Sequence, residues 1–218
     1  MKNHPRRPGG FTLVELLVVI AIIATLAAVI APLGRGMLAR SRTVNCSRNL
    51  RQIGLATMMY AGDNNMNLPV SSHQRSKGGK SWTLSLQPYA SENLTDKCAE
   101  DANKSRSYTY VLNDFLTPNP AGAPQLNYSI LAKIDRPQAT FLFAEAAADY
   151  TNADHFHFSK YYGGTIPPEV FASQIGVGTH EQKANYLFAD GHVETLTRLE
   201  TQARLSADGS RFVDPSPR

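Results

Sequence analysis

An acidic residue at the edge of a long apolar run is the first feature of this sequence with chemical consequences. Glu15 directly precedes nineteen uncharged residues, 16–34. At about 1.5 Å of rise per residue, a helix of this length spans roughly 28 Å, close to the hydrocarbon thickness of a bilayer. A carboxylate in lipid costs about 2.5–3.5 kcal/mol, so Glu15 needs a partner. The N-terminus of its own helix is one candidate.

The C-terminal part of the chain offers a second set of reactive side chains. His180, Asp190 and His192 supply two imidazoles and a carboxylate, which metal ions such as zinc accept as ligands. The spacing is not tight, however, and Asp190-Gly191 is typical of a two-residue hairpin turn. We therefore expect no cofactor, with a metal ion at these three residues as the alternative.

The two cysteines, Cys46 and Cys98, are an even pair that can form a disulfide in an extracytoplasmic domain. Their number alone leaves two free thiols equally open. The sequence contains no nucleophile motif, phosphate-binding loop or paired-carboxylate signature. We expect that the protein is not an enzyme.

The elements that position these residues begin with one long helix. It is expected to run past Pro32 to about Tyr60, although proline removes one helical hydrogen bond. Beyond Pro32, apolar and small residues recur at spacings of four, three, four and three, which predicts a buried helix face. They are Cys46, Leu50, Ile53, Thr57 and Tyr60. Arg48, Arg51 and Gln52 fall off this face and should be exposed.

The remaining chain predicts an α+β head with short strands. The expected strands cover residues 107–112, 139–144 and 154–162, and a hairpin of 185–189 with 192–197. Residues 82–89 suggest a short helix or strand under the main helix. From about Ser206 the sequence is polar and ends in Pro-Ser-Pro-Arg, which predicts a loose tail.

The charge balance argues against a nucleic-acid-binding protein. The chain has 22 basic and 18 acidic residues, a net charge of +4. Three of the basic residues, Lys2, Arg6 and Arg7, precede Gly10, which leaves 19 basic against 18 acidic residues after that point. A nearly neutral chain lacks the excess of cations that phosphate binding requires.

The N-terminal residues together resemble the start of type IV prepilins and type II secretion pseudopilins. A short basic stretch ends in Gly9-Gly10, Phe11 follows, and Glu15 is the fifth residue from Phe11. Pro32 is the twenty-second, where these helices often have a proline. The resemblance implies that a prepilin peptidase cuts after Gly10 and methylates the Phe11 amine. Glu15 of one subunit would then pair with the Phe11 cation of its neighbour.

The C-terminal motif resembles the same class of proteins. His180, nine residues, and then Asp190-Gly191 match the H-X9-DG motif found in proteins with prepilin-type N-termini. This resemblance implies a pilin-like fold, in which a long N-terminal helix packs on an antiparallel sheet. Proteins of this kind have no well-defined biochemical activity.

These observations predict five segments and one leading function. The segments are a leader (1–10), a transmembrane or filament-core helix (11–34), its amphipathic continuation (35–62), an extracytoplasmic head (63–205) and a flexible tail (206–218). We expect a single-pass inner-membrane precursor that becomes a subunit of a type IV pilus or type II secretion pseudopilus. Its partners would be the peptidase, other pilin-like subunits and the membrane. The alternative is a membrane-anchored surface protein that binds carbohydrate, DNA or an envelope protein without forming a filament.

Overall fold

The structure is a computed structural model that describes residues 11–72, 80–90, 94, 97–118, 127–151, 154–158, 161 and 164–216. For residues 31–35 it describes the backbone alone. The chain forms two compact units, Met1–Arg40 and Ser41–Arg218. The predicted leader, with Gly10, lies outside the described residues.

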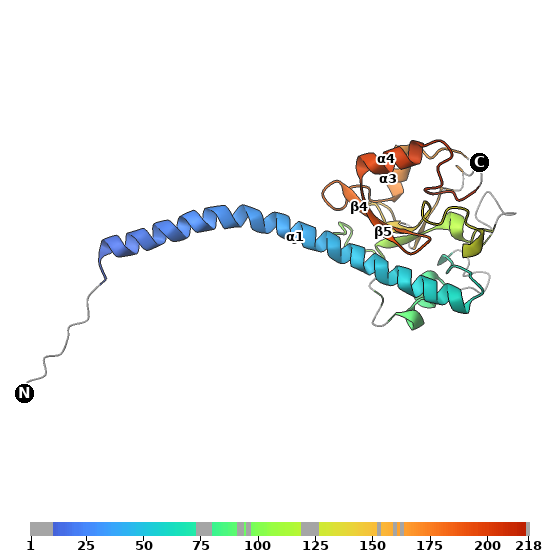
Figure 1. Ribbon diagram of the computed structural model, residues 1–218, viewed down its shortest axis with the longest axis horizontal. Helices are drawn as coiled ribbons and strands as arrows, with labels where there is room; N and C mark the ends of the chain where they lie inside the picture. The colour runs from blue at the N-terminus through green and yellow to red at the C-terminus, as the bar shows by residue number, and fades with distance from the viewer. Residues whose placement is uncertain are drawn as a thin grey trace, which may run out of the picture. The chain divides into compact units, whose positions relative to one another are not determined.

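One long helix, α1 (Leu13–Asp63), contributes to both units (Figure 1). It continues through Pro32, as the sequence predicts. All side chains of residues 11–30 are exposed. Residues 11–30 therefore form an apolar rod whose side chains are not buried.

The second half of α1, from Ser41, belongs to the head. Cys46, Leu50, Ile53 and Thr57 are at most 1% exposed, while Arg48 and Arg51 face solvent, which confirms the predicted helix face. The helix approaches the sheet closely at one glycine. A Cβ atom at Gly54 would lie 2.8 Å from Leu187 Cδ1, so the absence of a side chain permits this packing distance.

Five strands form one sheet in the head. Their bounds are β1 (Tyr110–Asn113), β2 (Phe141–Glu145), β3 (His155–Phe156), β4 (Lys183–Phe188) and β5 (Val193–Thr197). The order is β3-β1-β2-β4-β5, and neighbouring strands are antiparallel except for β1 and β3. The β4–β5 hairpin confirms the predicted pairing.

The long helix packed on an antiparallel sheet is confirmed, except at the β3 edge, where β1 and β3 are parallel. The connection from β2 reverses the chain and passes β1, which itself runs antiparallel to β2, so β3 and β1 point in the same direction. β3 is also shorter than the predicted strand at 154–162. After Phe156 the backbone of His157 bonds to the Gln174 side chain, at 2.7 Å and 2.8 Å, instead of to a strand.

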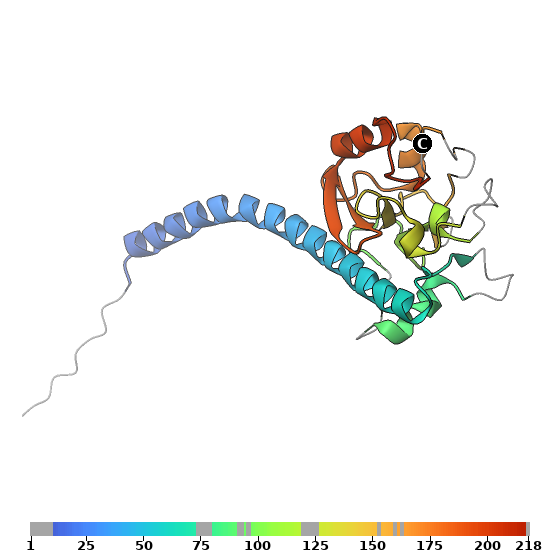
Figure 2. The same ribbon diagram turned by 45° about the vertical axis from the view of Figure 1, so that its right-hand side comes forward.

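Both faces of β1 and β2 are buried, which explains why these two strands read as nearly continuous apolar runs. Tyr110 and Leu112 of β1 lie in a cluster with Leu50 of α1. Val111, between them, lies in the opposite cluster with Phe171 and Leu205. In Figures 1 and 2 the second half of α1 covers one face, and α3 (Pro168–Gln174) and α4 (Arg198–Ser206) cover the other.

Shorter helical segments complete the head. They are α2 (Trp82–Ser85), η2 (Gln87–Tyr89), η3 (Asp114–Leu116) and η4 (Leu131–Lys133). Trp82 is fully buried in the cluster under α1, and its indole N–H donates to the Asp154 carbonyl at 2.8 Å. Of the two alternatives for residues 82–89, the helical one is therefore found.

The predicted loose tail is wrong for residues 211–216, whereas residues 206–209 are exposed and residues 217–218 lie outside the described residues. Residues 211–216 are buried, and the Phe212 ring contacts Phe141 and Tyr186 at centroid distances of 5.0 and 5.3 Å. The Phe141 N–H donates to the Phe212 carbonyl at 3.0 Å, and Asn113 Nδ2 donates to the Val213 carbonyl at 2.8 Å. Phe212 and Val213 supply the apolar area that is buried here. Because most residues around this pair are polar, the average composition of the segment did not predict its burial.

Candidate functional site

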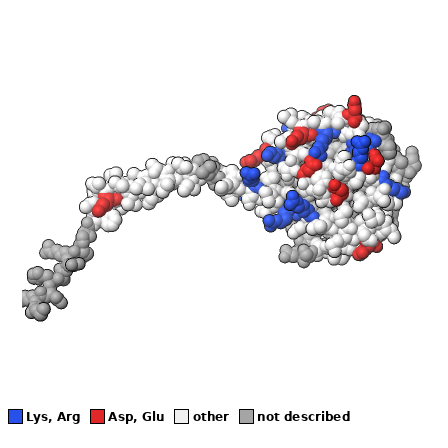
Figure 3. All heavy atoms as spheres, viewed as in Figure 1, with Lys and Arg blue, Asp and Glu red and all other residues white. Residues whose placement is uncertain are grey.

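The first half of α1 presents an extended, exposed apolar surface. Residues Leu13–Ile30 are long and apolar enough to cross a membrane, and none of this segment is buried. Figure 3 shows it as an uncharged surface with acidic atoms only near its start. Phe11, just before the helix, is 79% exposed. An apolar surface of this extent requires lipid or other helices as its environment.

Glu15 caps its own helix. Its Oε2 atom accepts hydrogen bonds from the Thr12 N–H and hydroxyl, both at 2.8 Å, and the Glu15 N–H donates to the Thr12 hydroxyl at 3.3 Å. This is a capping box, which stabilises the start of a helix. One candidate partner of Glu15, its own helix N-terminus, is therefore present.

A disulfide joins the second half of α1 to the loop before β1. The sulfur atoms of Cys46 and Cys98 are 2.13 Å apart. The same stretch of helix is bonded to β1, because Tyr110 Oη donates to the Cys46 carbonyl at 3.2 Å and Asn49 Nδ2 donates to Tyr110 Oη at 3.3 Å. The helix is thus fixed to the head by one covalent bond and several polar contacts.

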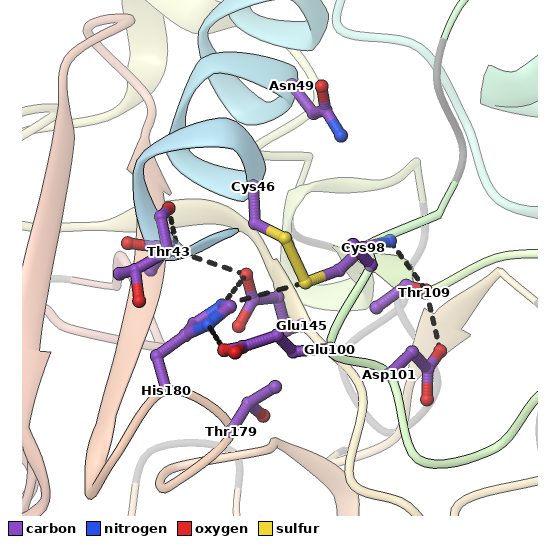
Figure 4. The surroundings of a disulfide bond; sticks show 12 residues. Thr43, Cys46, Asn49, Cys98, Glu100, Asp101, Thr109, Glu145, Thr179 and His180 are labelled. Carbon is purple, nitrogen blue, oxygen red and sulfur yellow. Dashed lines mark hydrogen bonds and ion pairs between the residues drawn. A yellow bond between two sulfur atoms is a disulfide. The ribbon is translucent and has the colours of Figure 1, made fainter. Parts of the chain in front are cut away.

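His180 lies buried beside this disulfide, between two carboxylates (Figure 4). Its Nδ1 atom is 2.5 Å from Glu100 Oε2, and its Nε2 atom is 2.9 Å from Glu145 Oε1 and 3.7 Å from Cys98 Sγ. Asn185 Nδ2 also donates to Glu145 Oε1, at 3.1 Å. The histidine therefore links β2, the start of β4 and the loop after Cys98.

The charge and orientation of His180 have separate causes. Burial is the largest influence and lowers the pKa of His180, but hydrogen bonds and charge from Glu145 and Glu100 together raise it above its usual value. The orientation comes from a tight turn, because His180 and Lys183 exchange backbone hydrogen bonds around Glu181 and Gln182. Both central residues have positive φ, 50° and 67°, a conformation typical of a type I′ turn and strained without glycine.

Asp190 and Gly191 form the opposite end of β4. The Gly191 N–H donates to the Phe188 carbonyl at 2.9 Å, and the Phe188 N–H donates to the His192 carbonyl at 2.8 Å. Gly191 has φ of 93°, as its type predicts, while Asp190 keeps negative φ. The loop is thus a three-residue turn with glycine in the left-handed position, rather than the predicted two-residue turn.

Comparison with known proteins identifies both parts of the sequence. Residues 5–31 match a family model described as the prokaryotic N-terminal methylation motif. Residues 39–112 match a second, described as a protein of unknown function (DUF1559). No curated protein and no solved structure matches the chain.

The chain therefore carries a prepilin-type methylation motif at its N-terminus. The matched segments cover the apolar half of α1 and then the region from the second half of α1 through most of β1. The exposed rod and the capped Glu15 therefore lie within the methylation motif. The cysteine pair and Glu100 lie within the second match, whereas His180 and Glu145 lie outside both.

The structure separates the candidate metal ligands. Six residues of β4, at about 3.3 Å each, put about 20 Å between the His180 turn and the β4–β5 turn. His180 contacts Glu100 and Glu145, while His192 is bonded to Asp190 at 2.5 Å and to Glu194 at 2.9 Å. The alternative, in which His180, Asp190 and His192 share one metal ion, is therefore wrong, since the strand between them holds them apart.

The sequence did not predict the partners of His180 in the head. Glu100 and Glu145 are 80 and 35 residues away in sequence, so no local spacing pairs them with His180. One signal was available for Glu145. It directly follows the apolar run 139–144, and an acid at the end of a buried strand requires a buried partner.

A second buried acid organises the far side of the head. Asp154 accepts hydrogen bonds from the Ser72 N–H at 2.9 Å and the Ser72 hydroxyl at 2.7 Å, and lies 2.6 Å from His155 Nδ1. Burial raises the pKa of Asp154, but the hydrogen bonds from His155 and Ser72 and the charge of His155 lower it below its usual value. These contacts connect β3 to the loop that follows α1.

Proposed function

We propose that this chain is a pilin-like structural subunit of a type IV pilus or a type II secretion pseudopilus. It is made as a precursor in the inner membrane, cut between Gly10 and Phe11, and methylated at Phe11 by a prepilin peptidase. The head lies outside the cytoplasm. The Cys46–Cys98 disulfide supports that location, because disulfides persist in oxidising compartments.

The observation that carries the proposal is the division of α1 into two halves of opposite character. Residues 11–30 are exposed throughout, whereas the half from Ser41 contributes a buried face and a disulfide to the head. Lipid covers the apolar half before assembly, and equivalent helices of other subunits cover it in a filament.

Glu15 changes partners in the proposed assembly. In the uncleaved chain both Thr12 hydrogen bonds end on Oε2. Cleavage before Phe11 creates an α-amino group with an ordinary pKa of about 7.7–8.0, and methylation leaves it cationic. In a filament core of low polarity, this cation and the carboxylate of a neighbouring Glu15 each require an opposite charge. Their pairing sets the axial position of one subunit against the next, and Pro32 shapes the helix that packs beside it.

Mass spectrometry of surface filaments tests the proposal directly. Filaments sheared from cells are digested, and the N-terminal peptide of this chain is identified. We expect a peptide that begins with N-methylated Phe11 in the sheared material. A chain that retains Met1, or one that never appears in the sheared fraction despite expression, contradicts the proposed function.

A further inference from the structure

Four atoms that could bind a metal ion lie close together around the Cys46–Cys98 disulfide. One atom each from Cys46, Cys98, Glu145 and His180 lies within 4.8 Å of every other, and all four residues are buried. They come from α1, the loop before β1, β2 and the turn before β4 (Figure 4). The fold therefore brings two sulfur, one oxygen and one nitrogen ligand to one point.

This set of atoms matches the preferences of zinc. Zinc binds thiolates at about 2.3 Å and imidazole or carboxylate at about 2.0–2.2 Å in tetrahedral geometry, which places ligand atoms roughly 3.3–3.8 Å apart. His180 Nε2 is 3.7 Å from Cys98 Sγ and 2.9 Å from Glu145 Oε1. Two bonded sulfurs cannot act as thiolate ligands, so the metal requires the reduced pair.

The groups around these atoms are arranged as they are around protein-bound zinc. A ligating histidine usually donates its other ring N–H to a carboxylate. Here His180 Nδ1 lies 2.5 Å from Glu100 Oε2. Asn185 Nδ2 holds Glu145 Oε1 in place at 3.1 Å. Both ligands that carry no sulfur are thus already oriented by a neighbouring side chain.

One oxygen atom of the Glu145 carboxylate lacks a hydrogen-bond partner in the oxidised head. Glu145 is fully buried, and its Oε2 atom has no hydrogen bond to any described residue. A buried carboxylate oxygen without a donor is unfavourable. A cation beside the carboxylate would satisfy it, which is a separate indication of a positive ligand at this position.

We propose that the reduced head binds one zinc ion through Cys46, Cys98, Glu145 and His180, and that disulfide formation releases it. On binding, the two thiols and His180 Nε2 lose their protons to solvent, and His180 coordinates through the deprotonated Nε2 atom. On oxidation, the two thiolates give two electrons to the disulfide of an oxidising dithiol protein, which takes up two protons and becomes two thiols. Zinc leaves as Zn²⁺ with no change of charge. The ion would hold α1 to the head before the disulfide forms, whether or not the chain enters a filament.

Cobalt and zinc binding by the full chain in detergent tests this site. The chain is reduced with a phosphine, titrated with Co²⁺, and then with Zn²⁺. We expect one Co²⁺ per chain, a thiolate-to-cobalt charge-transfer band, and loss of that band when Zn²⁺ replaces cobalt. The oxidised chain should show no such band. A reduced, folded chain without the band, or equal binding by the oxidised chain, overturns the proposal.

Matched histidine variants show whether the ligands are the ones named. His180→Gln should weaken Zn²⁺ affinity at least tenfold, and Glu145→Gln should do the same. His192→Gln, which changes a histidine at the other end of β4, should leave affinity unchanged. Equal affinity in the His180→Gln chain overturns the assignment.

The rate of cysteine alkylation tests the site even if reduction of the disulfide partly unfolds the head. Mass spectrometry measures alkylation of Cys46 and Cys98 in the reduced chain, with and without Zn²⁺, alongside circular dichroism. We expect Zn²⁺ to slow alkylation of both cysteines at least tenfold and to restore any lost helix signal. Alkylation at the same rate with and without Zn²⁺ contradicts the proposal in either conformational state.

Discussion

Glu15 and Glu200 show at the residue scale how one local motif has different consequences in different surroundings. Thr12 with Glu15 starts α1, and Thr197 with Glu200 starts α4, and each pair forms a capping box. The α4 cap lies on the water-exposed head, where it needs no other role. The α1 cap begins an apolar segment, where its carboxylate is costly unless it gains a cation.

Three alanine variants separate capping from subunit pairing. Glu15→Ala should reduce filament incorporation at least tenfold, a loss of about 1.4 kcal/mol or more per contact, without releasing the chain from membranes. Thr12→Ala removes the cap but keeps the carboxylate, so incorporation should stay within about twofold of wild type. Glu200→Ala removes the equivalent cap from α4 and serves as the control. Quantitative immunoblots of sheared and membrane fractions report all three, and equal losses for Glu15→Ala and Thr12→Ala would refute the pairing role.

The lowered pKa of Asp154 should make the stability of the head depend on pH. Because its folded-state pKa is lowered, the stability it contributes is present above the unfolded pKa of about 3.9 and is lost as the pH falls through the folded value. At pH 7, Asp154→Asn should lower the free energy of unfolding by about 1–3 kcal/mol. The difference from wild type should shrink below about pH 4, since protonation removes the same charge.

Urea unfolding at pH 7 and pH 3 measures this difference. Asp149→Asn, a change of the same type at an exposed position, should stay within about 0.5 kcal/mol of wild type at both values. A difference for Asp154→Asn that is as large at pH 3 as at pH 7 would show that the carboxylate charge does not contribute.

At the scale of elements, α1 and β4 each have two ends with different surroundings. α1 presents an apolar surface in its first half and a buried face in its second. His180 lies in the turn before β4, and Gly191 lies in the turn after it. The H-X9-DG motif therefore spans one strand and the turns at its two ends. The motif spacing therefore reflects strand length rather than a single chemical site.

Gly54 tests the close contact between α1 and this hairpin. Gly54→Val should lower the free energy of unfolding by about 1–3 kcal/mol, because a Cβ there would lie 2.8 Å from Leu187 and 3.5 Å from the Gly191 carbonyl. Gly62→Val, on the same helix with open space around it, should change stability by less than about 0.5 kcal/mol. Urea unfolding monitored by Trp82 fluorescence compares the two. Equal stabilities would show that α1 does not need a glycine here.

At the scale of the whole molecule, the two units differ in what they need from their surroundings. The head has buried clusters on both faces of its sheet and a covalent link to α1. The described helix of the first unit has no buried residue between positions 11 and 30. Lipid covers that helix in a solitary anchored protein, whereas a filament subunit contacts equivalent helices on several sides.

Cysteine cross-linking distinguishes these two assemblies. With Leu17→Cys and Ile23→Cys together, on different sides of the exposed helix, a bifunctional maleimide should give a ladder of multimers on denaturing gels. The same pair combined with Glu15→Ala should give mostly monomers. Monomers or dimers alone in the Glu15-containing chain would favour a membrane-anchored surface protein that does not polymerise.

The sequence by itself determined the features that repeat over short distances. The uncharged run after Glu15, the spacing of Cys46, Leu50 and Ile53, and the glycine of the hairpin predicted a membrane-length helix, its buried face and the pairing of β4 with β5, although not the length of the turn. These predictions hold because helix and strand periods are set by neighbouring residues. They did not fix the direction of β3, which depends on how the chain crosses the sheet.

Only the tertiary structure decided which residues meet around His180. Glu145 is 35 residues away, and Glu100 and Cys98 are 80 and 82 residues away, and each is brought to the imidazole by the packing of α1 and the sheet. The buried segment 211–216 has the same origin, since Phe212 fills a space formed by β2 and β4. Burial makes such polar and apolar contacts strong, but no local period encodes them.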